Sequence, residues 1–501
     1  MQCQLCTSFT SGLLSRVCYV VSVVIQALRL KAMSDESGKR FSREQIFCKV
    51  EVSTSIQGLS MSRRRALNHQ VEAVDLANRL QSLQLNGCLN QATEQVLSKK
   101  IANRLNQAAY QLEQDRDALP DAQACRENAN AIKCNNWEPL RRFYLKNFEQ
   151  IRQPAIIAPV PSMHNHPVLW SGFVALVSEH SMASGSAIND PSQLARLNST
   201  LYPDCPIGMV RTRFVGAHTV KATNIHHPPY FIPEYLPDPP EICVESVGYL
   251  LNTYTAQSVN HTLAALEPFW LPEQLAEIRQ LFETSDANEV QAALISLHNM
   301  THFLGSQPMN HANKESVPLM GGVDEELRAD SGSNVGLSAL GCALFNSQLI
   351  QAVTLMDILD RAFKYTLAAP SQDLDSLLLS HHDAAAGQMR LNALRHHQAL
   401  KQIQSAGQTF YYLDYQACLE SDRMILSELE SLDKIGLRDP DSYLAKRLEF
   451  LTKYLGTNEE EGWKLDPLYH EVRSASPWLS AQLVFEYPAE LELFTDLACL
   501  A

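Results

Sequence analysis

Apolar residues in the first part of the chain recur at helical spacing. Between residues 60 and 155 they are separated by three or four positions, as in Leu76, Leu80 and Leu83. This period gathers them on one face of a helix, and the intervening Gln and Asn residues suit the solvated face. We therefore predict helices throughout this segment.

A different pattern follows over residues 154–245. Pro, His, Thr and β-branched residues dominate there, which is typical of strands joined by long loops. We predict a mixed region with one helix over residues 171–179.

Helical spacing returns at residues 246–305 and continues in three more segments, 324–365, 371–405 and 408–455. A strand-like segment lies near the end, at residues 483–485. The predicted fold class is therefore mainly α with a smaller mixed α/β part.

Composition narrows the class of protein. Hydrophobic residues make up 45% of the 501 positions and charged residues 19%, so the chain can bury a sizeable core. The net charge of -14 argues against the broad basic face that a nucleic-acid partner requires. The twelve cysteines are mostly isolated, which favours reduced thiols and a cytoplasmic location. The apolar run at residues 17–28 is too short for a membrane span, where about 20 residues are needed, and we interpret it as part of a leader.

One histidine pair carries the most informative chemistry. His298 and His302 are four positions apart in a segment with helical spacing, so both imidazoles project from one helix face. This spacing lets them reach a single metal ion. Without further ligands, the same residues would be ordinary buried histidines.

A carboxylate pair strengthens the metal hypothesis. Glu326 and Asp330 share a face of the next predicted helix. Glu326 could bind the metal, and Asp330 could accept the free ring N–H of a ligand histidine and fix its tautomer. Two histidines and one carboxylate bind zinc in thermolysin-like sites and Fe(II) in non-haem oxygenases, so zinc is the first choice of metal and iron the alternative.

The segment 325–330, with the sequence EELRAD, resembles the EE-x-[RK]-A-[ED] motif of the dipeptidyl peptidase III-like zinc metallopeptidases. The resemblance implies that Glu326, His298 and His302 bind zinc in a zincin-like site built from two helices. It also implies that His382, at the start of a later helix, contacts a peptide substrate.

The sequence departs from that family at the position after the first histidine. The family has a glutamate there, which acts as general base, whereas this chain has Asn299. An amide cannot accept a proton at neutral pH. The hydrolase activity is therefore expected to be weak, altered or lost, unless Glu325 or another carboxylate takes over as the base.

Further polar residues in the mixed region are candidates for the substrate site. Cationic and hydrogen-bonding groups beside prolines could hold an anionic group of a small-molecule or peptide substrate. The candidate substrate-binding residues are Arg211, Arg213, His218, Lys221 and His227. Tyr230 is a candidate acid or oxyanion donor.

The sequence therefore predicts a metal-binding, peptidase-like protein. A non-haem iron oxygenase and a non-catalytic helical interaction protein are the alternatives. No membrane span is expected beyond the possible leader. The predicted organisation comprises a leader or disordered N-terminus (1–45), a helical N-terminal region (46–155), a mixed strand and loop region (156–245), a helical metal-site domain (246–460) and a C-terminal tail packed on the core (461–501).

Overall fold

The structure, a computed structural model, separates by its internal contacts into two units, Met1–Gln45 and Ile46–Ala501. The described residues all belong to the second unit and are 47–51, 58–160, 168–178, 191–203, 213–223, 230–231, 233, 236–237, 246–282, 284–302, 304–306, 322–364, 382–405, 407–436, 438–455, 457–458, 462–463, 465–475 and 482–486. The predicted leader lies outside them. Within these residues, no helix has both the length and the apolar character that crossing a bilayer requires.

Four helices form the first layer, α2 (Met61–Leu85), α3 (Gln91–Leu112), α4 (Leu119–Cys134) and α5 (Glu138–Asn147). The hydroxyl of Ser60 caps α2 by accepting a hydrogen bond from a backbone N–H of the first turn. The buried Ala, Leu and Val side chains of α2 and α3 recur at helical spacing. The helices predicted for this segment are therefore confirmed.

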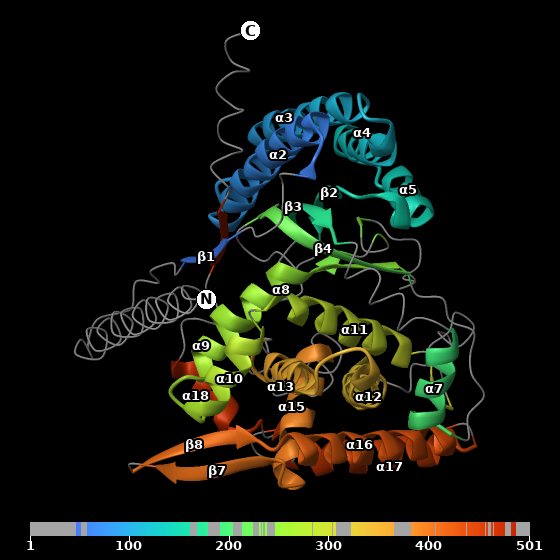
Figure 1. Cartoon of the computed structure of the whole chain (residues 1–501), viewed down its shortest axis with the longest axis vertical. Helices are drawn as coiled ribbons and strands as arrows, with labels where there is room; N and C mark the ends of the chain where they lie inside the picture. Colours follow the sequence, from blue (N-terminus) through green and yellow to red (C-terminus); the bar gives the residue numbers. More distant parts are fainter. Residues whose placement is uncertain are drawn as a thin grey trace, which may run out of the picture. The chain divides into compact units, whose positions relative to one another are not determined.

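A five-stranded mixed sheet packs beside these helices (Figure 1). Its strands, in spatial order, are β2 (Ala155–Val160), β3 (Leu169–Val177), β4 (Arg213–Ala222), β6 (Ser246–Leu250) and β5 (Tyr230–Phe231). The pair of β4 and β6 is parallel, and the other neighbours are antiparallel.

The helix predicted over residues 171–179 is wrong, because β3 occupies Leu169–Val177. Eight of its nine residues are buried. A strand covered on both faces loses the alternation of apolar and polar residues by which strands are recognised.

The rest of the described chain is mainly helical (Figure 1). The helices are α7 (Pro191–Leu201), α8 (Leu251–Gln257), the π-helix η5 (Ser258–Leu263), α9 (Ala264–Leu266), α10 (Pro272–Phe282), α11 (Ser285–Thr301), α12 (Gly322–Leu340), α13 (Ser347–Phe363), α15 (His382–His396), α16 (Tyr415–Gly436), α17 (Pro440–Leu455) and α18 (Pro467–Ala475). The predicted fold class, mainly α with a smaller mixed part, is confirmed. The predicted domain boundaries remain predictions.

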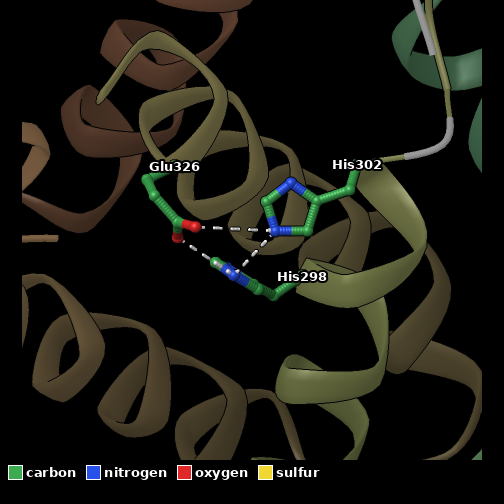
Figure 2. Close-up of side chains that lie close together, drawn as sticks. All are labelled: His298, His302 and Glu326. Atoms are coloured by element: carbon green, nitrogen blue, oxygen red, sulfur yellow. Dashed lines mark hydrogen bonds and ion pairs between the residues drawn. The ribbon is translucent and has the colours of Figure 1, made fainter. Parts of the chain in front are cut away.

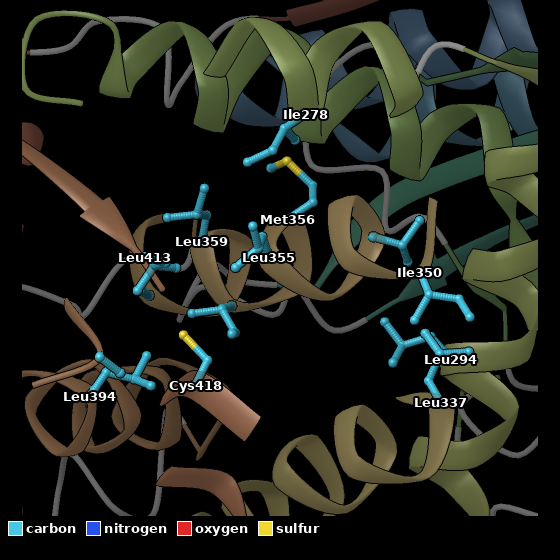
Figure 3. Close-up of a cluster of buried hydrophobic side chains, with 14 of the residues drawn as sticks. Ile278, Leu294, Leu337, Ile350, Leu355, Met356, Leu359, Leu394, Leu413 and Cys418 are labelled. Atoms are coloured by element: carbon cyan, nitrogen blue, oxygen red, sulfur yellow. The ribbon is translucent and has the colours of Figure 1, made fainter. Parts of the chain in front are cut away.

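Helix α13 lies in the middle of the second core (Figure 3). Its Ile350, Met356 and Leu359 are each at most 1% exposed. They belong to one apolar cluster with Leu294 of α11 and Leu337 of α12. This cluster fixes α11, α12 and α13 against one another, and these helices carry the polar residues described below.

Helices α11 and α12 approach closely at Gly332. A Cβ atom added there would lie 2.5 Å from Cγ2 of Thr301, well inside van der Waals contact. Only glycine fits such an approach without displacement. The close crossing occurs next to His302, at the end of α11.

Three predicted helical segments, 246–305, 371–405 and 408–455, contain strands. Residues 400–405 and 408–413 form an antiparallel hairpin, β7 (Leu400–Ser405) and β8 (Gln408–Leu413), and residues 246–250 form β6. Gly407 in the hairpin turn has a φ of +79°, which a glycine adopts without strain.

The remaining strands of the described residues form two further two-stranded sheets. Strands β9 (Thr457–Asn458) and β10 (Gly462–Trp463) pair antiparallel. Strand β11 (Gln482–Glu486), which contains the predicted strand at residues 483–485, pairs in parallel with β1 (Phe47–Glu51). The first and last described segments are thus joined by backbone hydrogen bonds.

Candidate metal centre

The histidine pair lies in the last turn of α11. The preceding residues 290–297 are buried almost throughout, which anchors this end of the helix in the core. His298 is the fourth residue from the C-terminus of α11, and His302 is the residue that ends it. Their rings face each other edge to face, and the two Nε2 atoms are 3.2 Å apart. One helix turn thus brings both ring nitrogens to one point.

Glu326, in the first turns of α12, completes a three-ligand cluster with the histidines (Figure 2). Its Oε2 lies 3.4 Å from Nε2 of His298, and its Oε1 lies 3.9 Å from Nε2 of His302. For zinc–ligand bonds of about 2.05 Å, the edge of a coordination tetrahedron is about 3.3 Å. The three separations are close to that edge, so the donor atoms fit one tetrahedral ion.

The opposite nitrogen of each imidazole contacts a carboxylate. Nδ1 of His298 is 3.0 Å from Oδ1 of Asp330, and Nδ1 of His302 is 3.0 Å from Oε1 of Glu325. Ionised carboxylates only accept hydrogen bonds, so each Nδ1 donates, and in the neutral form of the ring Nε2 then has a lone pair for a metal ion. Carboxylate–histidine pairs of this kind orient metal ligands.

Without a metal ion, the pKa values of two cluster residues are shifted strongly in opposite directions. Burial alone would lower the pKa of His298, but its hydrogen bonds to Asp330 and Glu326 outweigh this effect and raise the pKa to about 9. Burial would raise the pKa of Glu326, yet the hydrogen bond from His298 and the charge of His302 hold it well below its usual range. A metal ion at this site therefore competes with a proton for His298.

Asn299 follows the first histidine and is buried at the same helix end. Its amide is hydrogen-bonded to the phenol of Tyr249, the fourth residue of β6. Burial raises the pKa of Tyr249, so the hydroxyl keeps its proton at neutral pH. Neither group at this position can act as a base.

An arginine and an aspartate extend the cluster beyond Asp330. Nη2 of Arg361, on α13, lies 3.2 Å from Oδ1 of Asp330. The same guanidinium forms an ion pair with Asp383, the second residue of α15. Sequence reasoning missed Tyr249 and Arg361. Neither residue has a local motif, since the fold brings both to the site from distant segments.

The other predicted site residues are only partly located. Tyr230 is paired in register with Tyr249, and Arg213 is paired in register with Ser246. His382 is the first residue of α15, directly before Asp383. Arg211 and His227 lie outside the described residues.

Lys221 and His218 both lie on β4. Nζ of Lys221 is 3.1 Å from Oδ1 of Asp75, so this side chain is paired with α2. Burial lowers the pKa of His218, which disfavours a charged anion-binding form at neutral pH. The ion pair of Lys221 and the lowered pKa of His218 make both side chains less available to an anion than they would be on a solvated loop.

Comparison with known proteins agrees with this architecture. No family model matches the chain, and no curated protein matches it by sequence. Several solved chains are similar to it, and two of them match over most of their length. DPP III from Caldithrix abyssi superposes with a TM-score of 0.62 at 12% identity, covering 90% of this chain and 98% of its own. Dipeptidyl-peptidase III from Corallococcus sp. strain EGB gives a TM-score of 0.56 at 13% identity, covering 90% and 97%. The distant resemblance inferred from the sequence is thus confirmed at the level of the fold.

Proposed function

We propose that this chain is a zinc-binding protein whose peptidase activity is weak, altered or lost. The observation that carries the proposal is the convergence of His298, His302 and Glu326, whose donor atoms all lie within 4.8 Å of one another. The fold shared with two dipeptidyl peptidase III structures supports a peptide as the substrate class.

Zinc suits the donor atoms better than iron. Neighbouring ligands of a six-coordinate iron centre with bonds of about 2.15 Å lie about 3.0 Å apart. The separations here run from 3.2 to 3.9 Å. A zinc ion held here would supply Lewis-acid polarisation of a carbonyl group.

Four residues around the cluster have distinct proposed roles. Asp330 and Glu325 hold the two ligand imidazoles through Nδ1. Because Oε1 of Glu325 is engaged with His302, Glu325 is better suited to orient that ring than to take a proton. Tyr249 remains protonated and can donate a hydrogen bond, whereas Asn299 can only position a polar group.

Three residues keep the roles proposed from the sequence. His382 remains a proposed substrate contact that could stabilise an oxyanion, Tyr230 a proposed acid or oxyanion donor, and Arg213 a proposed anion-binding residue. Their backbone positions are known, at the start of α15 and on two strands of the mixed sheet.

We also propose that the protein works in the cytoplasm. Five cysteines of the described residues are free thiols, which agrees with a reducing compartment: Cys88, Cys125, Cys134, Cys342 and Cys418.

The test is elemental analysis of the purified protein beside its His298→Ala and Glu326→Ala variants. Near-stoichiometric zinc that both substitutions remove would support the proposal. Iron in the same position would favour the oxygenase alternative. If the unsubstituted protein binds no added metal, a non-catalytic interaction protein becomes the better interpretation.

A further inference from the structure

Each of the two ligand histidines is the first member of a row of four contacting side chains. On the side of His302, Glu325 contacts the ring through Oε1, and its Oε2 lies 3.6 Å from Nε of Arg328. Nη2 of Arg328 lies 2.6 Å from Oδ2 of Asp433 on α16. The side chains of Arg328 and Asp433 are each only 1% exposed. The order is therefore histidine, carboxylate, arginine, aspartate.

The row of side chains that begins at His298 has the same order. His298 contacts Asp330, Asp330 contacts Arg361, and Arg361 pairs with Asp383. The side chain of Asp330 is 1% exposed and that of Arg361 is 15% exposed. Beyond α12, the row that begins at His302 continues on α16, and the row that begins at His298 continues on α13 and α15.

The arginines restrict how the carboxylates can turn. A carboxylate with one partner can rotate about its last side-chain bond, and the ring that it contacts can follow. A guanidinium is planar and presents several N–H groups in a fixed fork, so a second partner of this kind limits the rotation. Arg328 lies against Oε2 of Glu325, the oxygen that does not contact His302. Arg361 contacts Oδ1 of Asp330, the same oxygen that faces His298. Each arginine in turn pairs with an aspartate on another helix, which ties the row of side chains to that helix.

Backbone packing adds to this restraint. Gly305, just after His302, has a φ of +90°, and a Cβ atom there would lie 3.3 Å from Nη1 of Arg328. Gly387 of α15 faces the carbonyl oxygen of Arg361, which would lie 2.0 Å from an added Cβ. Backbone therefore lies against the guanidinium of Arg328, whereas at Arg361 the close contact fixes the helix backbone that carries the side chain.

We propose that Arg328 and Arg361 are positioning residues of the metal centre, each orienting the carboxylate that in turn orients one ligand histidine. This inference rests on the proposed zinc site. It assigns to the arginines an effect on metal affinity and ligand geometry that is separate from their contribution to stability.

Arg390 provides a matched control. Its side chain is also 1% exposed, and it pairs with Asp422 at 2.7 Å and with Asp357 at 3.3 Å. Neither of those carboxylates is hydrogen-bonded to a ligand histidine, and Arg390 acts on the site only through space, since its charge contributes to the lowered pKa of Asp330. Its substitution should lower stability as much as that of Arg328 does.

The experiment uses the full chain with Arg328→Gln, Arg361→Gln or Arg390→Gln. Zinc affinity is measured by competition with a chromophoric chelator, and the visible spectrum of the cobalt(II)-loaded protein reports ligand geometry. We expect about 10–100-fold weaker zinc binding and altered cobalt bands for the first two variants. The Arg390 variant should lose thermal stability, with a much smaller change in affinity and in the spectrum, because Arg390 acts on Asp330 only through space.

Two outcomes would overturn the inference alone. One is unchanged zinc affinity and cobalt spectrum in both arginine variants, and the other is an equal loss of affinity in the Arg390 variant. If the unsubstituted protein binds neither ion, the proposed metal centre fails as well. Should Arg328→Gln or Arg361→Gln not fold, Asp433→Asn and Asp383→Asn release the same guanidinium groups, and the same expectations apply to them.

Discussion

Asp330 faces His298 across the contact between α12 and α11, with Oδ1 3.0 Å from Nδ1. The pair sets the charge of the metal-free centre, because the carboxylate favours the protonated ring. Since a metal ion requires the neutral ring, the same contact orients His298 and opposes metal binding at low pH.

Zinc affinity should therefore rise with pH. His298 must lose a proton whose pKa is about 9, so the dissociation constant should fall about tenfold per pH unit between pH 7 and pH 9. Chelator competition at several pH values measures this slope. Without the carboxylate of Asp330, the pKa of His298 should be lower, so zinc affinity in Asp330→Asn should stop rising at a lower pH. An identical pH profile in both proteins would contradict the assigned contact.

Thermal stability of the metal-free protein should fall over a similar range. The pKa of His298 is raised from 6.5 to about 9 in the folded state, so its stabilising contribution is complete below pH 6.5 and is lost as pH rises through 9. A shift of this size corresponds to a loss on the order of 3 kcal/mol. Melting curves of the apoprotein check the prediction, and His298→Ala should lack this part of the pH dependence.

Chelation should destabilise the native protein. An ion bound only to the folded state adds stability that grows with its concentration over the dissociation constant, about 2.7 kcal/mol at a hundredfold excess. Scanning calorimetry with and without a strong chelator measures the difference. Glu326→Ala should melt at the same temperature under both conditions.

Restoring a carboxylate beside the first histidine should increase hydrolysis. Asn299→Glu supplies a general base, an effect of about 10²–10⁴-fold in enzymes that use one. Turnover of a chromogenic dipeptidyl amide by the zinc-loaded protein tests this. Asn299→Gln is the control, because it adds length without basicity. Equal turnover by the two variants would count against a peptide-cleaving ancestry of this site.

The close approach of α15 to α13 should not tolerate a larger residue. In Gly387→Ala the new methyl group would overlap the carbonyl oxygen of Arg361, so we expect a loss of about 1–3 kcal/mol or more. Chemical denaturation measures this loss. Gly58→Ala, where nothing lies within 4 Å, should leave the unfolding free energy nearly unchanged.

The three residues of the candidate metal cluster could be predicted because their signals are local. His298 and His302 are one helix turn apart, and Glu326 stands in a short motif at the start of a helix. By contrast, Arg361 reaches the site only through the packing of α13 against α12 and α15. No spacing along the sequence encodes such a contact.

The same distinction explains the errors in secondary structure. Strand β3 is buried on both faces, so its apolar run also suits a buried helix. The hairpin of β7 and β8 has mostly exposed or half-buried residues, and its clearest signal was the single Gly407 of the turn. The long helices were predicted well because each repeats its apolar period over several turns.

The pairing of β1 with β11 has a consequence for biosynthesis. Residues 47–51 are synthesised long before residues 482–486, so this two-stranded sheet cannot form until the later segment has been made. Until then, the backbone groups of β1 lack this partner and another chain could bind them. Premature termination before residue 482 would leave β1 without β11.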